Sequence, residues 1–375
     1  MLRCPSSKLK FLVLSCFLCG ANAFSDNVSL SLSLSAFSHQ ALSFDPTTLG
    51  GKERSYESVS GFVPELGFTL SFSPQAMMEI GTLYAFRFSW LPENEAISVK
   101  GEGDLLNAGT TSAHKTERHD MTGYVRMELG QGTAGFLVRG GIVRSELLAT
   151  RNQPRVNAFL LPWITWHWTA GHESHVFLFN RREWDASAPE NSVESSVPHW
   201  FNVSGGMAHQ WSVNAHTTLG AAYVQESLLA NDPWFDHTKR GAILRLGIHP
   251  FSEVYLEGRF EGARRIFELP WKRMGSCQSG SNVRSAYYAN DPLNCSRNET
   301  ETFYQVQAHW DPKPPLRFSL RYFVAETKVA DLKEFDTSTT WIEASLVWQM
   351  GGKTSLPSIL EFLPYDRRQF DRQGF

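Results

Sequence analysis

The sequence lacks any long apolar run after its N-terminus, since no later segment holds about 18 to 20 consecutive apolar residues, and this excludes a transmembrane helix. It also lacks a strong charge of either sign. With 35 Lys and Arg against 38 Asp and Glu, nothing indicates the dominant basic face of a nucleic-acid-binding protein. Aromatic residues, in contrast, make up 13% of the chain and include twelve tryptophans. This mixture favours elements that each carry one apolar and one polar surface.

The N-terminus has the three regions of a secretory signal peptide. A basic start is followed by a short apolar stretch, Phe11–Cys19, and then by Ala21-Asn22-Ala23, which fits the small-x-small cleavage rule. We therefore predict that residues 1–23 are a signal peptide and that the mature chain starts at Phe24. A lipoprotein signal cleaved before Cys16 is the alternative, and the Ala-x-Ala site fits better.

Cysteine is scarce. The mature chain keeps only Cys277 and Cys295, both within the polar stretch 266–300. An even pair in an exported protein predicts one disulfide that clamps a loop. We expect this bridge to protect a long surface loop, with a lid or a pore-folded loop as the alternative. We expect no metal bound by this pair and no cofactor.

What the sequence has in abundance is strict alternation. In VSLSLSLSAF, residues 28–37, Val and Leu alternate with Ser, and this period of two is typical of a strand whose faces meet different surroundings. The pattern returns along the chain, often with aromatic residues on the apolar face. We predict about fourteen strands, with twelve or sixteen as alternatives. Their expected bounds are 28–37, 57–72, 76–90, 119–130, 133–148, 155–168, 174–182, 199–210, 214–229, 238–249, 252–265, 301–311, 315–328 and 338–350.

Short turns alternate with longer polar connections along the chain, such as those at 38–56, 91–118, 183–198 and 266–300. Short turns at one rim and long loops at the other are the layout of a membrane barrel. A soluble β-sandwich would also alternate, but its strands average about 5 or 6 residues. Most strands here have about 10 to 15, which is long enough to cross a bilayer when tilted. We therefore predict an all-β fold, a transmembrane antiparallel up-and-down β-barrel over residues 24–350.

Over this span the chain resembles Gram-negative outer-membrane β-barrel proteins in its strand pattern and loop layout, although no family motif accompanies the pattern. The resemblance implies location in the bacterial cell outer membrane, contact with outer-membrane lipid and folding by the barrel assembly machinery. It does not imply a function, because barrels of about this size include nonspecific channels, fatty-acid transporters and surface-export factors.

Residues 351–375 depart from this resemblance. Such proteins usually end with their last strand and a terminal aromatic residue, and this chain does end in Phe375. Its last alternating segment nevertheless stops near Met350, and the sequence that follows contains two prolines and mixed charges. We expect a periplasmic tail here, with a segment folded up into the lumen as the alternative.

The polar faces of the predicted strands carry mixed charges, which would point into the barrel. One interpretation is a constriction that orients a passing polar solute, and the other is a set of structural ion pairs that fill the lumen. The sequence leaves both open because it does not give the register. Several of the arginines could form a basic ladder, but the acids among them argue against a strong anion preference. The predicted pore-lining residues are Glu79, Arg87, Arg126, Glu128, Arg139, Arg245, Glu257, Arg259, Glu261, Arg317, Arg321 and Glu343.

The leading functional hypothesis is a porin-like channel for small polar solutes. The alternative is a non-conducting barrel that anchors surface loops or assists export or assembly of a partner. A membrane-embedded hydrolase comes third, because histidines such as His167 lie in or beside strands without the motif context of a triad or metal site. We therefore predict that the protein is not an enzyme and binds no metal.

Overall fold

The structure is a computed structural model of the 375-residue chain. It describes residues 28–44, 54–75, 77–91, 94–99, 105–111, 114–145, 155–185, 200–230, 237–267, 298–313, 315–329, 336–351 and 358–364. The predicted signal peptide and the predicted Cys277–Cys295 disulfide lie outside these residues. Within them, no helix is both long and apolar enough to span a membrane.

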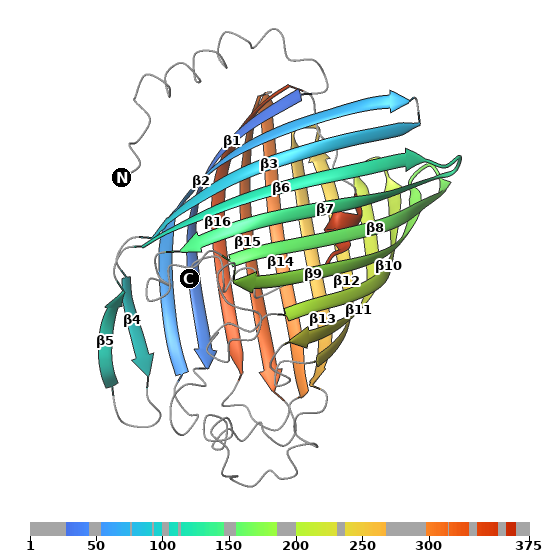
Figure 1. Cartoon of the computed structure of the whole chain (residues 1–375). Helices are drawn as coiled ribbons and strands as arrows, with labels where there is room; N and C mark the ends of the chain where they lie inside the picture. Colours follow the sequence, from blue (N-terminus) through green and yellow to red (C-terminus); the bar gives the residue numbers. More distant parts are fainter. Residues whose placement is uncertain are drawn as a thin grey trace.

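Fourteen strands form one closed antiparallel barrel (Figure 1). The first strand, β1, pairs with β2 along one edge and with the last strand, β16, along the other, so the ring has no free edge there. All other neighbours in the ring follow the order of the chain, as expected for an up-and-down barrel. The bounds are β1 Val28–Phe44, β2 Arg54–Gln75, β3 Met78–Leu91, β6 His114–Glu128, β7 Gly132–Ser145, β8 Arg155–Thr169, β9 His172–Asp185, β10 Trp200–Asn214, β11 Thr217–Ala230, β12 His237–Phe251, β13 Val254–Phe267, β14 Asn298–Lys313, β15 Leu316–Val329 and β16 Thr337–Gly351.

The fold class and the strand count predicted from the sequence are confirmed, and each predicted strand corresponds to one strand of the ring. The predicted loop 38–56 is shorter than expected, because β1 continues to Phe44 and β2 begins at Arg54. The stretch 91–118, predicted as a loop, is different. It contains two further strands, β4 (Asn94–Val99) and β5 (Leu105–Thr111), which pair with each other. The start of β2 extends past the last residue paired with β3 and leaves an open edge, to which β4 adds. Figure 1 shows this hairpin beside the barrel.

The two rims differ as the sequence predicted. The connections between β6 and β7, and between β8 and β9, are short turns in which Gly130 and Gly171 adopt positive φ angles of 60° and 94°. Glycine meets this backbone conformation without a Cβ clash. The opposite rim carries the longer connections, and both ends of the ring, Val28 and Gly351, lie at the short-turn rim.

The outer surface of the barrel is apolar. On the outward side of β14, Val306 is 59% exposed and lies between Tyr304 and Trp310, which are also exposed. Trp168 and Trp310 lie exposed near the short-turn rim, as expected of an aromatic belt at a membrane interface. Residues between these positions face inward and are mostly polar or charged. An apolar outer surface on a closed ring of hydrogen-bonded strands is the arrangement that a bilayer requires.

A lysine placed on the outward face should therefore cost far more than one placed inward on the same strand. We expect Val306→Lys to lower the free energy of unfolding by about 2–4 kcal/mol, the cost reported for a cation near the middle of the lipid-facing surface. The neighbouring inward substitution, Gln307→Lys, should cost less than about 1 kcal/mol because its ammonium stays hydrated. Urea titration of the barrel folded in liposomes measures both. An equal loss, or a larger one for Gln307→Lys, would contradict this assignment of faces.

Candidate functional site

The predicted interior charges mostly occur as ion pairs between inward-facing side chains. All of them except Glu128, which lies exposed at the short-turn end of β6, contact an opposite charge. Several partners are acids that the sequence had not selected, namely Glu65, Asp120 and Asp311. The pairs are Arg87–Glu65 at 2.7 Å, Arg139–Asp120 at 2.5 Å, Arg245–Glu257 at 3.0 Å, Arg259–Glu261 at 3.2 Å, Arg317–Asp311 at 2.7 Å, and the close pairs Arg126–Glu79 and Arg321–Glu343.

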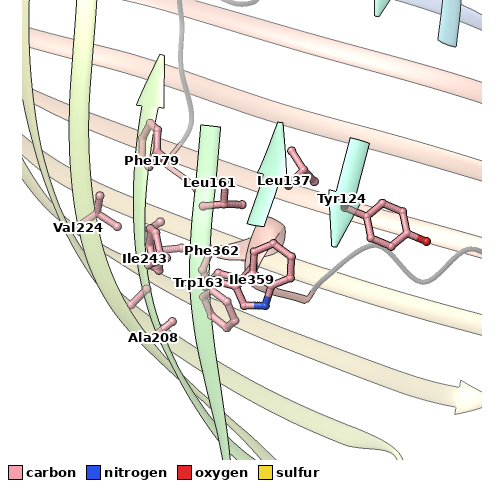
Figure 2. Packing of buried hydrophobic residues seen from close by; sticks show 12 residues of the cluster. Tyr124, Leu137, Leu161, Trp163, Phe179, Ala208, Val224, Ile243, Ile359 and Phe362 are labelled. Atoms are coloured by element: carbon pink, nitrogen blue, oxygen red, sulfur yellow. The ribbon is translucent and has the colours of Figure 1, made fainter. Parts of the chain in front are cut away.

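The described part of the C-terminal tail, residues 358–364, lies inside the barrel, and we call it the C-terminal segment. Its 3-10 helix, η5 (Ser358–Phe362), is the short red element seen within the ring in Figure 1. Ile359 and Phe362 are fully buried in a cluster with inward side chains of the wall, among them Trp163 and Ile243 (Figure 2). The segment therefore occupies part of the lumen.

The wall provides space for the segment at Gly220 on β11. A Cβ atom built there would lie 2.8 Å from the ring of Phe362, which is closer than such atoms approach in proteins. His175 on β9, which is also fully buried, has its ring centroid 5.6 Å from that of Phe362. The packing is thus specific to this part of the wall, and the apolar contacts fix the depth at which the segment sits.

Two arginines on neighbouring strands hold the segment by polar contacts. Arg245 on β12 forms a close ion pair with Glu361, and its guanidinium lies 5.3 Å from the centroid of the Phe362 ring. Arg259 on β13 donates hydrogen bonds to the backbone carbonyls of Glu361, at 3.1 Å, and Leu363, at 2.5 Å. Both arginines were predicted to line a pore, and in the structure both bind the chain's own tail.

A cavity of about 430 Å³ lies beside the segment, on the side of the long-connection rim. Four arginines and two acids line it. Arg118 and Arg139 share the carboxylate of Asp120, at 2.6 and 2.5 Å. The other lining residues are Glu65, Leu83, Ala85, Thr122, Leu137, Asn157, Phe159, Arg181, Arg259, Phe303, Gln305, Leu360, Leu363 and Pro364.

Sequence reasoning missed two of the four arginines. Arg118 fell in the stretch 91–118 predicted as a loop, and Arg181 lies near the end of the predicted strand 174–182, in which four consecutive apolar residues, 176–179, obscure the alternation. The acids that argued against an anion preference, Glu257, Glu261 and Glu343, do not line the cavity. Each pairs with a basic residue on its own or a neighbouring strand. The alternation of apolar and polar residues does not show which charged side chains form ion pairs, so the sequence could not reveal these pairs.

A serine and a histidine do approach each other, but on the outer face. Oγ of Ser174 lies 2.9 Å from Nδ1 of His209 and accepts a hydrogen bond from Nε1 of Trp168 at 2.8 Å. Among the described residues, no three His, Cys, Asp or Glu side chains are grouped so as to hold a metal ion. A nucleophile needs a base that a third group orients, in contact with substrate. This pair at the aromatic rim does not have that arrangement.

The docking of the C-terminal segment predicts how a truncation of its main apolar anchor behaves. With Cys277 and Cys295 replaced by Ser, a thiol placed by Ile359→Cys should react slowly with a maleimide, because position 359 is fully buried. Adding Phe362→Ala should speed the reaction at least tenfold, since such truncations cost about 3–5 kcal/mol of packing. Ser358→Ala, which removes only a 3.4 Å contact to Glu173, is the matched control and should change little. Fast labelling without Phe362→Ala would contradict the docked position.

Comparisons with known proteins give a likeness of architecture and no family. No family model matches the chain, and no curated protein matches it. Among solved structures, the Pseudomonas putida toluene transporter TodX is similar with 8% identity, 87% of this chain and 89% of that chain covered and a TM-score of 0.47. A Pseudomonas aeruginosa FadL homologue is 7% identical, with 88% of this chain and 91% of that chain covered and a TM-score of 0.40. Pseudomonas aeruginosa OprD is 10% identical, with 88% of this chain and 97% of that chain covered and a TM-score of 0.39.

Identities and TM-scores this low say nothing about the activity or the solute of this protein. The assignment of the fold rests on the chain's own geometry. A closed ring of fourteen antiparallel strands, an apolar outer surface with tryptophans near one rim and a charged interior have all been described above. The chain has the fold of a transmembrane β-barrel, and no family within that class is identified.

Proposed function

We propose that the protein is an outer-membrane channel for small polar solutes that the C-terminal segment closes in this conformation. The observation that carries the proposal is the position of this segment between the short-turn rim and a charged cavity. If the segment filled the lumen only to stabilise the barrel, no charged cavity would be needed beside it. A channel, in contrast, needs a polar interior site that a solute can enter and leave.

The contacts of the segment suit a reversible closure. Burying Ile359 and Phe362 contributes about 1.5–3 kcal/mol each, and the two hydrogen bonds from Arg259 contribute about 1.5–3 kcal/mol each because the donor is charged. Ordering the seven residues costs about 1–2 kcal/mol apiece. The gain of about 6–12 kcal/mol, to which the Arg245–Glu361 ion pair adds, and the cost of about 7–14 kcal/mol nearly cancel. Small changes in contacts can therefore shift the segment between docked and released states.

Planar-bilayer conductance of the refolded full-length mature chain tests the proposal. We expect the chain to be mostly closed, because the segment occupies the lumen. The double substitution Ile359→Ser/Phe362→Ser, which keeps the full length, should raise the mean conductance at least fivefold, and deletion of residues 358–375 should do the same. Ser358→Ala should behave like the unaltered chain. If both releasing variants fold, as judged by heat-modifiable migration, and stay silent, the channel proposal fails.

A second candidate function is a non-conducting barrel that anchors surface loops or assists a partner. The observation in its favour is the bracing of the interior, in which Arg245 bridges Glu257 on the wall and Glu361 on the segment. Silent but folded variants, together with a partner that co-purifies with the full chain and is lost on deleting residues 351–375, would support it.

A further inference from the structure

We propose that the cavity beside the C-terminal segment is a binding site for a small organic anion, a carboxylate carried on an apolar body. The inference rests on the proposed function, because it names the class of solute that the channel would admit. It depends on three properties of the wall: its charge, its unpartnered polar atoms and its apolar surface.

The charge of the wall favours an anion. Four arginines, Arg118, Arg139, Arg181 and Arg259, line the cavity against two acids, Glu65 and Asp120, which leaves a formal excess of two positive charges. Two wall residues pair with charges outside the wall, Glu65 with Arg87 at 2.7 Å and Arg259 with Glu261 at 3.2 Å, and these two pairs leave the excess unchanged. The partly apolar surroundings strengthen the attraction between such an excess and an anion.

Two of these arginines also keep buried donors without partners. Within the described part of the chain, Nε of Arg139 and Nε of Arg259 have no hydrogen-bond acceptor, although other nitrogens of both side chains are engaged; both Nε atoms are buried, so they reach a ligand in the cavity only if the side chain turns. A buried donor that makes no hydrogen bond costs folding free energy. A carboxylate is the strongest acceptor for a guanidinium.

The remaining wall is apolar. Leu137, Phe159 and Phe303 of the barrel and Leu360 and Leu363 of the C-terminal segment line the cavity, and all but Phe303 belong to the cluster around Phe362. A volume of about 430 Å³ lies in the range of about 300–1,000 Å³ found for small-molecule sites. An inorganic anion would leave these surfaces uncovered, and a sugar would desolvate its hydroxyls against them. An aromatic or short aliphatic carboxylate matches both parts of the wall.

Isothermal titration of the full mature chain in a zwitterionic detergent tests the site, with benzoate as the probe. Benzamide has the same shape without the charge, and inorganic phosphate has charge without the apolar body. We expect benzoate to bind at least tenfold more tightly than either. Equal affinity for benzoate and benzamide would overturn the anion site, and equal affinity for benzoate and phosphate would overturn the apolar part of the proposal.

Two variants place the binding in the cavity. Arg139→Gln should weaken benzoate binding at least tenfold, while Lys328→Gln, which removes one positive charge from an exposed side chain away from the cavity, should leave it unchanged. Because Arg139→Gln also breaks a pair with Asp120, Ala85→Trp serves as a second test, filling the cavity without altering charge. Benzoate binding unaffected by Ala85→Trp would overturn the location.

The two proposals fail separately. Benzoate binding to a barrel whose releasing variants stay silent would leave the anion site standing and overturn the channel. Conducting releasing variants in a barrel that does not bind benzoate would leave the channel standing and overturn the anion site.

Discussion

The structure depends on one constraint, which is that no backbone N–H or C=O group can go unpaired in a lipid bilayer. For strands, only a closed ring meets it, and here the pairing of β1 with both β2 and β16 provides the closure. Closure in turn requires the strict alternation of the sequence, because each strand presents one face to lipid and the other to the lumen. A shift of one residue in any strand would exchange these faces.

Closure also creates an interior that must be filled or hydrated. The inward residues fill the interior in two ways. Around much of the ring, opposite charges on facing positions pair, as Arg321 does with Glu343 and Arg87 with Glu65. Across β7 to β12, however, inward apolar side chains such as Trp163 and Ile243 leave a surface that water would cover poorly, and Ile359 and Phe362 of the tail pack on it. Arg259 joins the two regions, since it binds the segment and lines the cavity.

The sequence predicted what depends on alternation. The fold class, the number of barrel strands and the two unlike rims follow from period two and loop length. What depends on register was not predictable, including the sharing of Asp120 by Arg118 and Arg139 and the grouping of four arginines at one cavity. The β4–β5 hairpin was missed because short strands that add to an edge lack a long alternating pattern. For residues 351–375 the sequence left both a periplasmic tail and a lumen segment open, because two apolar residues in a short segment do not show what they contact.

The central claim is that alternate residues of each strand face lipid and lumen, and accessibility along a single strand tests it most directly. Spin labels placed one at a time at residues 303–309 of β14 can be compared by power-saturation electron paramagnetic resonance for collision with oxygen, which concentrates in lipid, and with a water-soluble nickel complex. The account predicts oxygen maxima at positions 304, 306 and 308, where Tyr304 and Val306 are exposed on the outer face. Oxygen access that does not alternate, or that peaks at 305 and 307, would contradict it.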